Sequence, residues 1–159
     1  MTFSIHGLPV ARGIAIGRAV LVAPSRVEVT HYFIQPDEIK AEIERLRVAR
    51  DAVVDELQRM QAEMPKDMPP ELGAMLDVHL MLLQDETLAY EIRRWIKERL
   101  YNAEWALISQ LEVVVRQFDE MDDPYLRERK ADLEQVVDRV LRHLNGAATP
   151  IAAPPPRPP

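Results

Sequence analysis

The residue types that most often carry chemistry in proteins are scarce in this sequence. It holds four histidines, His6, His31, His79 and His143, and no cysteine. None of them has a second histidine four residues away, which is the spacing at which one helix face holds a metal ion. The serines lack the flanking glycines of a nucleophile elbow. We therefore expect no catalytic residue and no metal site in this chain.

His79 is the histidine that stands in a polar neighbourhood on an expected helix, between Asp77 and Asp85. The three residues do not share one helix face, so we interpret His79 as a surface or interface residue rather than a metal ligand. The acidic run at 119–123 lacks the alternating ligands and the central glycine of a calcium loop. We interpret it, like Asp85 and Glu86, as charge at the end of a helix.

Composition excludes several classes of protein. The chain has 159 residues, and 26 acidic against 20 basic side chains give a net charge of −6. It lacks the basic footprint of a nucleic-acid binder, although it suits a basic protein partner. No apolar run approaches the roughly 20 residues that span a bilayer. We expect a protein without membrane segments, and the lack of cysteine is compatible with the cytosol.

Pattern divides the chain into three parts. Residues 1–34 indicate β structure, with strands at 13–22 and 26–33 that read as apolar or alternating with period two. Residues 35–146 indicate helices, and 147–159 form a tail rich in proline and alanine that we expect to be disordered. The expected fold is mainly α: an antiparallel helical bundle preceded by a short two-strand segment that belongs to an incomplete α/β domain.

Five helices are expected, at about 36–64, 70–84, 86–100, 103–121 and 124–144. Proline suits the first helical position at Pro36, and Asp123 before Pro124 is an N-cap signal. Gly146 stands where a left-handed C-terminal residue is usual. The apolar residues of the first and last helices alternate by three and four positions, which predicts a heptad-like seam on each.

The second helix carries apolar residues on nearly all sides. One stripe, which we expect to face the core, is Leu72, Leu76, Leu80 and Leu83. A second stripe mixes apolar residues with acids: Glu71, Met75, Val78, Leu82 and Asp85, with Asp77 and Met81 beside it. Exposed apolar area rimmed by acids is typical of a docking site for a basic partner. The residues alone leave open whether this stripe is such a site or is buried inside the bundle.

Four ordered segments resemble one known family. Residues 7–19 (GLPVARGIAIGRA), 77–85 (DVHLMLLQD), 101–106 (YNAEWA) and 122–133 (DDPYLRERKADL) are similar to motifs near the start of enzyme I of the bacterial phosphoenolpyruvate–sugar phosphotransferase system. The match covers about residues 5–146. Ala11 departs from the small residue, often serine, that the family has at that position.

The resemblance implies an HPr-binding-like helical domain, here residues 35–146, next to the first strands of a phosphohistidine domain. It implies a cytoplasmic protein whose partner is the phosphocarrier HPr. The family's phosphorylated histidine follows Gly-Gly-x-Thr-Ser, and none of the four histidines here follows Thr-Ser. By that resemblance this chain alone is inactive and holds no cofactor, because the family's Mg²⁺ belongs to a C-terminal domain.

Carried over by position, the resemblance places the partner-facing surface on one set of residues: Glu71, Ala74, Asp77, Val78, His79, Met81, Leu82, Asp85, Glu86, Phe118 and Arg129. Most of them coincide with the second stripe, which favours docking over burial. Two alternatives stay open. One is a stand-alone docking module that sequesters the carrier, and the other is a helical protein that forms a homo-oligomer through its heptad seams.

Overall fold

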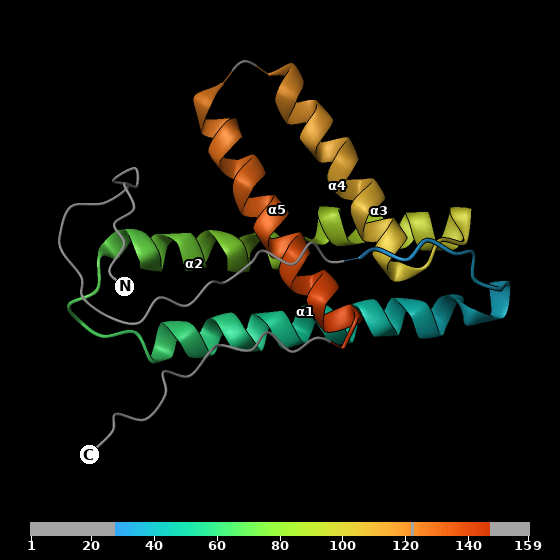
Figure 1. Ribbon diagram of the computed structural model, residues 1–159, viewed down its shortest axis with the longest axis horizontal. Helices are drawn as coiled ribbons and strands as arrows, with labels where there is room; N and C mark the ends of the chain where they lie inside the picture. The colour runs from blue at the N-terminus through green and yellow to red at the C-terminus, as the bar shows by residue number, and fades with distance from the viewer. Residues whose placement is uncertain (1–27, 122, 147–159) are drawn as a thin grey trace, which may run out of the picture.

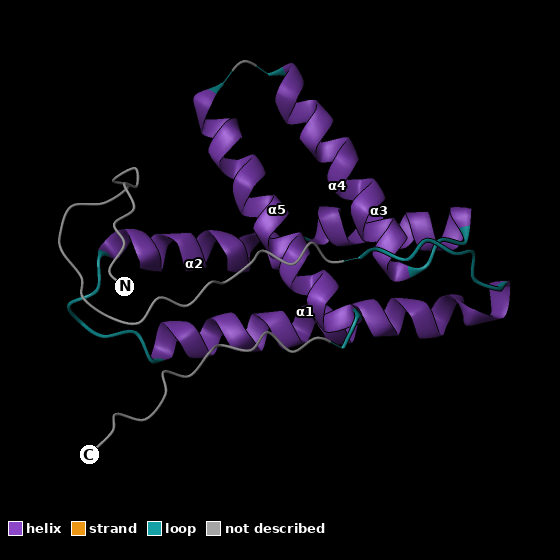
Figure 2. Ribbon diagram, viewed as in Figure 1, coloured by secondary structure: helices purple, strands orange, loops and turns teal. Residues whose placement is uncertain are grey.

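The computed structural model describes residues 28–121 and 123–146, and everything below refers to these residues. They form a short 3₁₀ turn and five α-helices: η1 (Pro36–Glu38), α1 (Ile39–Ala62), α2 (Pro70–Leu83), α3 (Glu86–Arg99), α4 (Ala103–Glu120) and α5 (Pro124–Leu144). The five helices expected from the sequence are therefore confirmed, each within a few residues. In Figure 2 the described part of the chain is helix and loop throughout, without a strand.

The helices form two groups that cross each other. Helices α2 and α3 lie end to end in one row, beside α1, and α4 and α5 form a hairpin that leans across both (Figure 1). At the base of the hairpin α5 packs on α1 and α2, and α4 packs on α3 and α1. The two helices of the hairpin are also joined by an ion pair between Lys130 and Asp119, with the charged atoms 2.8 Å apart.

Helix ends follow the signals in the sequence. Asp85 and Asp123 each accept a hydrogen bond from the backbone of the following helix, at Leu88 N (2.8 Å) and Tyr125 N (2.9 Å). Gly146 has φ +70°, as a residue after a helix often does. Leu100, which ends α3, is left-handed too at φ 57°, and its side chain packs partly against the core.

The core is a single apolar cluster that every helix enters. Val53 and Leu57 of α1 and Ile96 of α3 are completely buried, and Leu76 of α2 is nearly so. From α5 the cluster takes Leu133, Val136, Val137, Val140 and Leu141. The seams expected on the first and last helices therefore face inward within the chain. On α2, Leu76 and Leu83 of the stripe expected to face the core are buried, and Leu80 packs partly against it.

The expected β segment takes a different form where it is described. Residues 28–33 run as an extended chain whose single bridge is antiparallel, between Phe33 and Tyr101. Ile34 N donates to the Leu100 carbonyl (2.8 Å), and Asn102 N donates to the Tyr32 carbonyl (3.2 Å). The two-strand segment is therefore unconfirmed: the strand expected at 13–22 lies outside the described residues, and so does the start of the one expected at 26–33.

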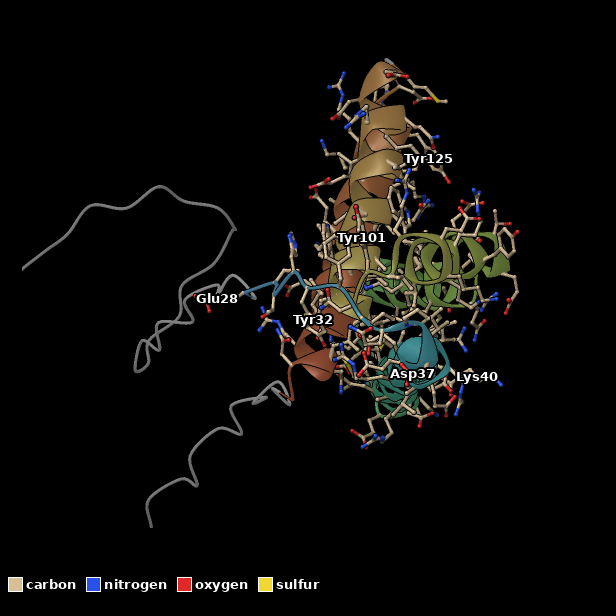
Figure 3. The ribbon with its side chains drawn as sticks, turned by 90° about the vertical axis from the view of Figure 1, so that its right-hand side faces the viewer. Glu28, Tyr32, Asp37, Lys40, Tyr101 and Tyr125 are labelled. Atoms are coloured by element: carbon tan, nitrogen blue, oxygen red, sulfur yellow. The ribbon has the colours of Figure 1, made fainter. Side chains whose placement is uncertain are left out.

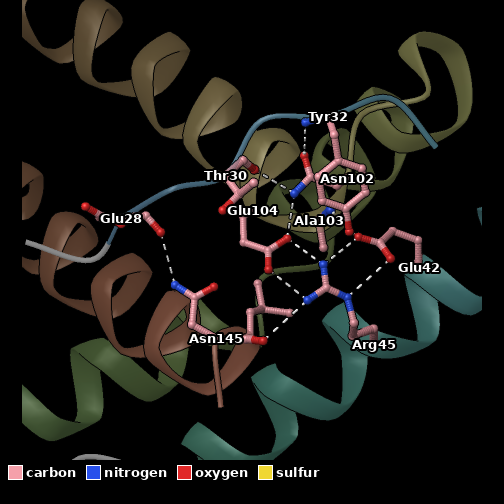
Figure 4. A network of polar contacts seen from close by, with 10 residues as sticks. Glu28, Thr30, Tyr32, Glu42, Arg45, Asn102, Ala103, Glu104 and Asn145 are labelled. Atoms are coloured by element: carbon pink, nitrogen blue, oxygen red, sulfur yellow. Dashed lines mark hydrogen bonds and ion pairs between the residues drawn. The ribbon is translucent and has the colours of Figure 1, made fainter. Parts of the chain in front are cut away.

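A network around Arg45 joins this extended segment to three helices (Figure 4). The Arg45 guanidinium donates to Glu42 on its own helix (2.7 Å) and to Glu104 on α4 (2.8 Å). It also reaches the Leu144 carbonyl at the end of α5 (3.4 Å). Glu42 in turn accepts a hydrogen bond from Ala103 N (2.6 Å) and so caps the start of α4. We refer to Glu42, Arg45, Asn102, Ala103 and Glu104 as the Arg45 network.

Asn102 ties the extended segment into this network. Its side-chain amide donates to the Thr30 carbonyl (2.8 Å) and to Glu104 (2.8 Å), and its side-chain oxygen accepts from Tyr32 N (3.2 Å). The expectation that Asn102 precedes α4 is confirmed, but the Asn102 side chain caps no helical amide. It holds the neighbouring chain instead.

The carboxylates of the Arg45 network are ionised. Burial acts to raise the pKa of Glu104, but the hydrogen bond from Arg45, together with those from its own backbone and from Asn102, outweighs that effect and lowers it. The hydrogen bond with Glu104 raises the pKa of Arg45, and the bond with Glu42 adds to it. The network is therefore a set of buried charges that must be paired to be tolerated.

Aromatic rings stack beside the network. Tyr101 lies between Trp105, with ring centroids 3.6 Å apart, and Trp95, with centroids 5.7 Å apart. His31 and Phe33 of the extended segment contact the Trp105 ring at 5.0 and 5.1 Å. In Figure 3 Tyr101 lies low in the hairpin, near Tyr32, whereas Tyr125 lies near its far end. The stack therefore fixes the extended segment at the base of the hairpin.

We expect Arg45→Met to lower the free energy of unfolding by about 3–5 kcal/mol, because it leaves two buried carboxylates without their cation. Arg47→Met is the matched control on the same helix. Arg47 is exposed and pairs with Glu44 and Asp51, so its loss should cost about 0.5 kcal/mol or less. Urea unfolding of both variants measures the difference, and equal losses would contradict the role given to Arg45.

The lowered pKa of Glu104 predicts acid sensitivity. A carboxyl group whose pKa is lower in the folded chain than in the unfolded one stabilises the fold above the unfolded pKa, and that contribution is lost as the pH falls. Urea unfolding from about pH 7 to about pH 3 should therefore show a shallower loss of stability in Glu104→Gln than in the wild type. Identical slopes in the two proteins would show that Glu104 does not contribute.

Candidate functional site

A surface groove runs between the α2–α3 row and the α4–α5 hairpin. It has a volume of about 710 Å³ and takes its lining from α2, α3, α4 and α5. Five of the residues that the sequence placed at a partner surface lie along it: Met81, Leu82, Asp85, Phe118 and Arg129. They come from three helices and are separated by up to 48 positions in the sequence (129 minus 81). The fold therefore brings the distant parts of the expected surface together.

The middle of the groove is apolar. Leu82, Leu88 and Val114 pack partly against the core and leave the rest of their surface in the groove. Met81 stands at its edge with 59% of its surface exposed. Methionine adapts its shape to a partner, and a flexible apolar side chain in this position suits the binding of another protein rather than a rigid small molecule.

The rim of the groove is charged. On α3, Arg94 pairs with Glu91 (3.1 Å) and Glu98 (3.2 Å), so these charges largely compensate one another. Asp85 is exposed, and its carboxylate caps α3. On α5, the Arg129 guanidinium lies 4.8 Å from the centre of the Tyr125 ring. Its hydrogen bond with Tyr125, helped by the charge of Asp132, raises the pKa of Arg129.

Other expected residues lie on α2 or just after it, beyond the lining of the groove. Glu71, Ala74 and Asp77 are exposed, and Val78 is half-buried. Asp77 accepts a hydrogen bond from Gln61 of α1 (2.7 Å). Glu86, at the start of α3, is exposed and lies 3.6 Å from Arg93. This part of the expected surface continues the groove along α2 as an exposed acidic face.

His79 is the exception among the expected surface residues. Its exposed fraction is 0%, so the expectation of a surface or interface histidine is wrong. His79 lies three residues after Leu76 and four before Leu83, both buried, and so it belongs to the stripe that faces the core. A partner in the groove has no access to its ring.

Sequence reasoning missed the α3–α4 half of the groove. Trp95 lines it and donates through its indole nitrogen to the Gln110 side chain (3.1 Å). Glu91, Arg94 and Val113 line it too. The one local signal was the position of Arg94, with an acid three residues before it and another four residues after it, which marks an ordered exposed face.

The remaining histidines make structural contacts where they are described. His31 stacks on Trp105, and the Nε2 atom of His143 lies 3.3 Å from a carboxylate oxygen of Glu56. His6 lies outside the described residues. Across 28–121 and 123–146 no group of three or more histidine, aspartate or glutamate side chains is placed to hold a metal ion. No helix in these ranges is both long enough and apolar enough to cross a membrane.

Comparison with known proteins shows the family. The model of the family described as PEP-utilising enzyme, N-terminal, matches residues 6–129. This chain belongs to that family. Among curated proteins, the phosphoenolpyruvate-protein phosphotransferase of Cupriavidus necator is 54% identical over 156 residues, which are 98% of this chain and 27% of that protein. The protein of the same name from Listeria monocytogenes is 31% identical over 94% of this chain and 26% of its own length.

Solved structures agree with the sequence relatives. An enzyme I protein studied in solution by NMR superposes with a TM-score of 0.71 and 26% identity, over 77% of this chain and 49% of that one. A structure described as the N-terminal domain of Enzyme 1 - Nitrogen superposes with a TM-score of 0.68 and 29% identity, over 77% and 50%. The resemblance to the enzyme I N-terminal region is therefore confirmed. The chain spans about a quarter of the length of the curated relatives named above.

Asp85 has two separable roles, as the N-cap of α3 and as a charge on the groove. We expect Asp85→Ala to lower the free energy of unfolding by about 1 kcal/mol, because the Leu88 amide loses its acceptor. Asp85→Asn keeps an acceptor oxygen and removes the charge, so it should unfold nearly as the wild type does. Chemical denaturation followed by circular dichroism tests this, and an equal loss in both variants would contradict the capping role.

Proposed function

We propose that this chain is the part of a cytoplasmic enzyme I that docks the phosphocarrier HPr for phosphoryl transfer. The observation that supports the proposal best is the convergence of Met81, Asp85, Phe118 and Arg129 on one groove. These residues were chosen from the resemblance before any spatial relation between them was known. Convergence of residues from three helices is expected of a binding surface and not of positions taken at random.

The groove suits a basic protein with an apolar centre. Met81 and Leu82 supply the apolar anchor, and Phe118 extends it onto α4. The carboxylates of Glu71, Asp77 and Asp85 extend along α2 as the acidic part of the same surface. In such an arrangement the apolar centre gives most of the affinity, and the acids steer a basic rim toward it and fix its orientation.

Phosphoryl transfer itself needs groups that the described residues do not supply. The family's phosphorylated histidine motif is missing from this sequence, and the described acids and histidines form no cluster that fits Mg²⁺. In the proposal the chain therefore contributes recognition and orientation of the carrier, whereas the phosphoryl group comes from elsewhere. Self-association through the heptad seams is disfavoured, because seam residues such as Val53, Leu57 and Val137 are buried inside the chain.

Met81→Asp tests the proposal in a calorimetric titration with unphosphorylated HPr of Cupriavidus necator. We expect binding in the roughly micromolar range to weaken by about 2 kcal/mol or more, some thirtyfold, because a charge enters the apolar anchor. Val48→Asp is the matched control, since Val48 is similarly exposed at 54% but stands on α1 outside the groove. This control should bind as the wild type does.

Ionic strength gives a second measure of the same surface. If acids of the groove steer a basic partner, wild-type affinity falls as salt is added, because screening weakens attraction between exposed charges. A wild-type chain that is helical by circular dichroism but does not bind HPr would overturn the proposal. Equal weakening by Met81→Asp and Val48→Asp would move the binding surface away from the groove.

A further inference from the structure

The buried ring of His79 is unexplained by packing alone. Neither of its nitrogens has a hydrogen-bond partner within the described residues, although the side chain is completely buried. Buried polar atoms without partners are rare, because they lose their hydrogen bonds to water without replacement. A leucine, like its neighbours Leu76, Leu80 and Leu83, would fill this position on α2 without that cost. The imidazole must therefore offer something that an apolar side chain does not.

The charged group that His79 faces is Asp132 on α5. The Nε2 atom of His79 lies 3.4 Å from one carboxylate oxygen of Asp132. The other oxygen accepts a hydrogen bond from the guanidinium of Arg129, one turn earlier on the same helix (3.3 Å). Arg129 lines the docking groove. Two contacts therefore connect a ring that no partner can reach with a charge that a partner meets.

Exposure changes stepwise along this connection. The side chain of His79 is 0% exposed, that of Asp132 is 21% exposed and that of Arg129 is 25% exposed. With Arg129 as its one contact, the Asp132 carboxylate is free to turn toward solvent. The imidazole on the other oxygen restricts that rotation, and Asp132 then presents a fixed acceptor to Arg129. The Tyr125 ring lies against the same guanidinium, at 4.8 Å.

We propose that His79 is a positioning residue for the docking groove, which orients Asp132 from the core side so that Asp132 holds Arg129 in place. This inference rests on the proposed function. The groove also carries Asp85 and Glu91. A guanidinium that is held by Asp132 leaves these carboxylates to the basic side chains of a partner. A guanidinium that is released competes with the partner for them and has more conformational freedom to lose on binding.

Two substitutions separate positioning from packing. His79→Leu keeps an apolar volume of similar size and removes the ring nitrogens. His79→Gln keeps an amide N–H donor at about the reach of the imidazole Nε2. We expect His79→Leu to weaken binding of Cupriavidus necator HPr by about tenfold and His79→Gln to restore most of the affinity. A variant acting through packing alone would show the opposite order, because the polar glutamine fits the core less well.

The link to Arg129 is tested by a double-mutant cycle. Against an Arg129→Ala background, His79→Leu should change HPr affinity by no more than about twofold, because the residue it positions is gone. A tenfold effect that persists in this background would overturn the proposal. Asp132→Asn, on a half-exposed helix face, should weaken HPr binding as His79→Leu does, and it keeps the test decisive if His79→Leu fails to fold.

A measurement on the chain alone separates this inference from the proposed function. The Nε–Hε resonance of Arg129 in proton–nitrogen NMR reports whether the guanidinium is held. We expect one slowly exchanging resonance in the wild type and in His79→Gln, and a shifted, faster-exchanging one in His79→Leu. An unchanged resonance in His79→Leu would overturn the positioning role. Absence of HPr binding by the wild type would overturn the docking function, and this resonance would still decide the role of His79.

Discussion

The fold depends on one arginine placed between two buried carboxylates. Arg45 pairs with Glu42 beside it and with Glu104 on α4, and it also bonds the last carbonyl of α5. Glu42 caps the first amide of α4 at Ala103. The position where α4 starts, the position where α5 ends and the path of the extended segment are therefore determined by a single set of charges. A well-packed apolar cluster would often be as stable, but it would not fix three backbone segments in one geometry.

The groove is a consequence of that constraint. Because the Arg45 network fixes the base of the α4–α5 hairpin against α1, the hairpin crosses the α2–α3 row at a defined place (Figure 1). Phe118 and Arg129 lie beyond the crossing, opposite Met81. None of these three side chains belongs to the network, and their relative positions still depend on it. The shape of the candidate site is set at the base of the hairpin and expressed farther along it.

Local signals predicted the helices and half of the site, and the failures have physical reasons. Asp123, Pro124 and Gly146 act within one turn of the chain, so the sequence reveals them directly. The bridge of Phe33 with Tyr101 joins residues 68 positions apart (101 minus 33), and no local pattern announces it. His79 was misplaced because its polar type was weighed above its position, which shares the three-and-four spacing of the buried leucines of α2. The α3 side of the groove was missed because its pairing with α4 is a property of the tertiary fold.

The aromatic stack gives the chain an optical property of its own. The sequence has two tryptophans, and both belong to the stack: Trp95 lines the groove, Trp105 contacts the extended segment, and Tyr101 lies between them. At these separations excitation passes between rings, so the emission of the two indoles is not independent. Intrinsic fluorescence of the unlabelled chain therefore reports on the groove and on the attachment of the extended segment in one signal.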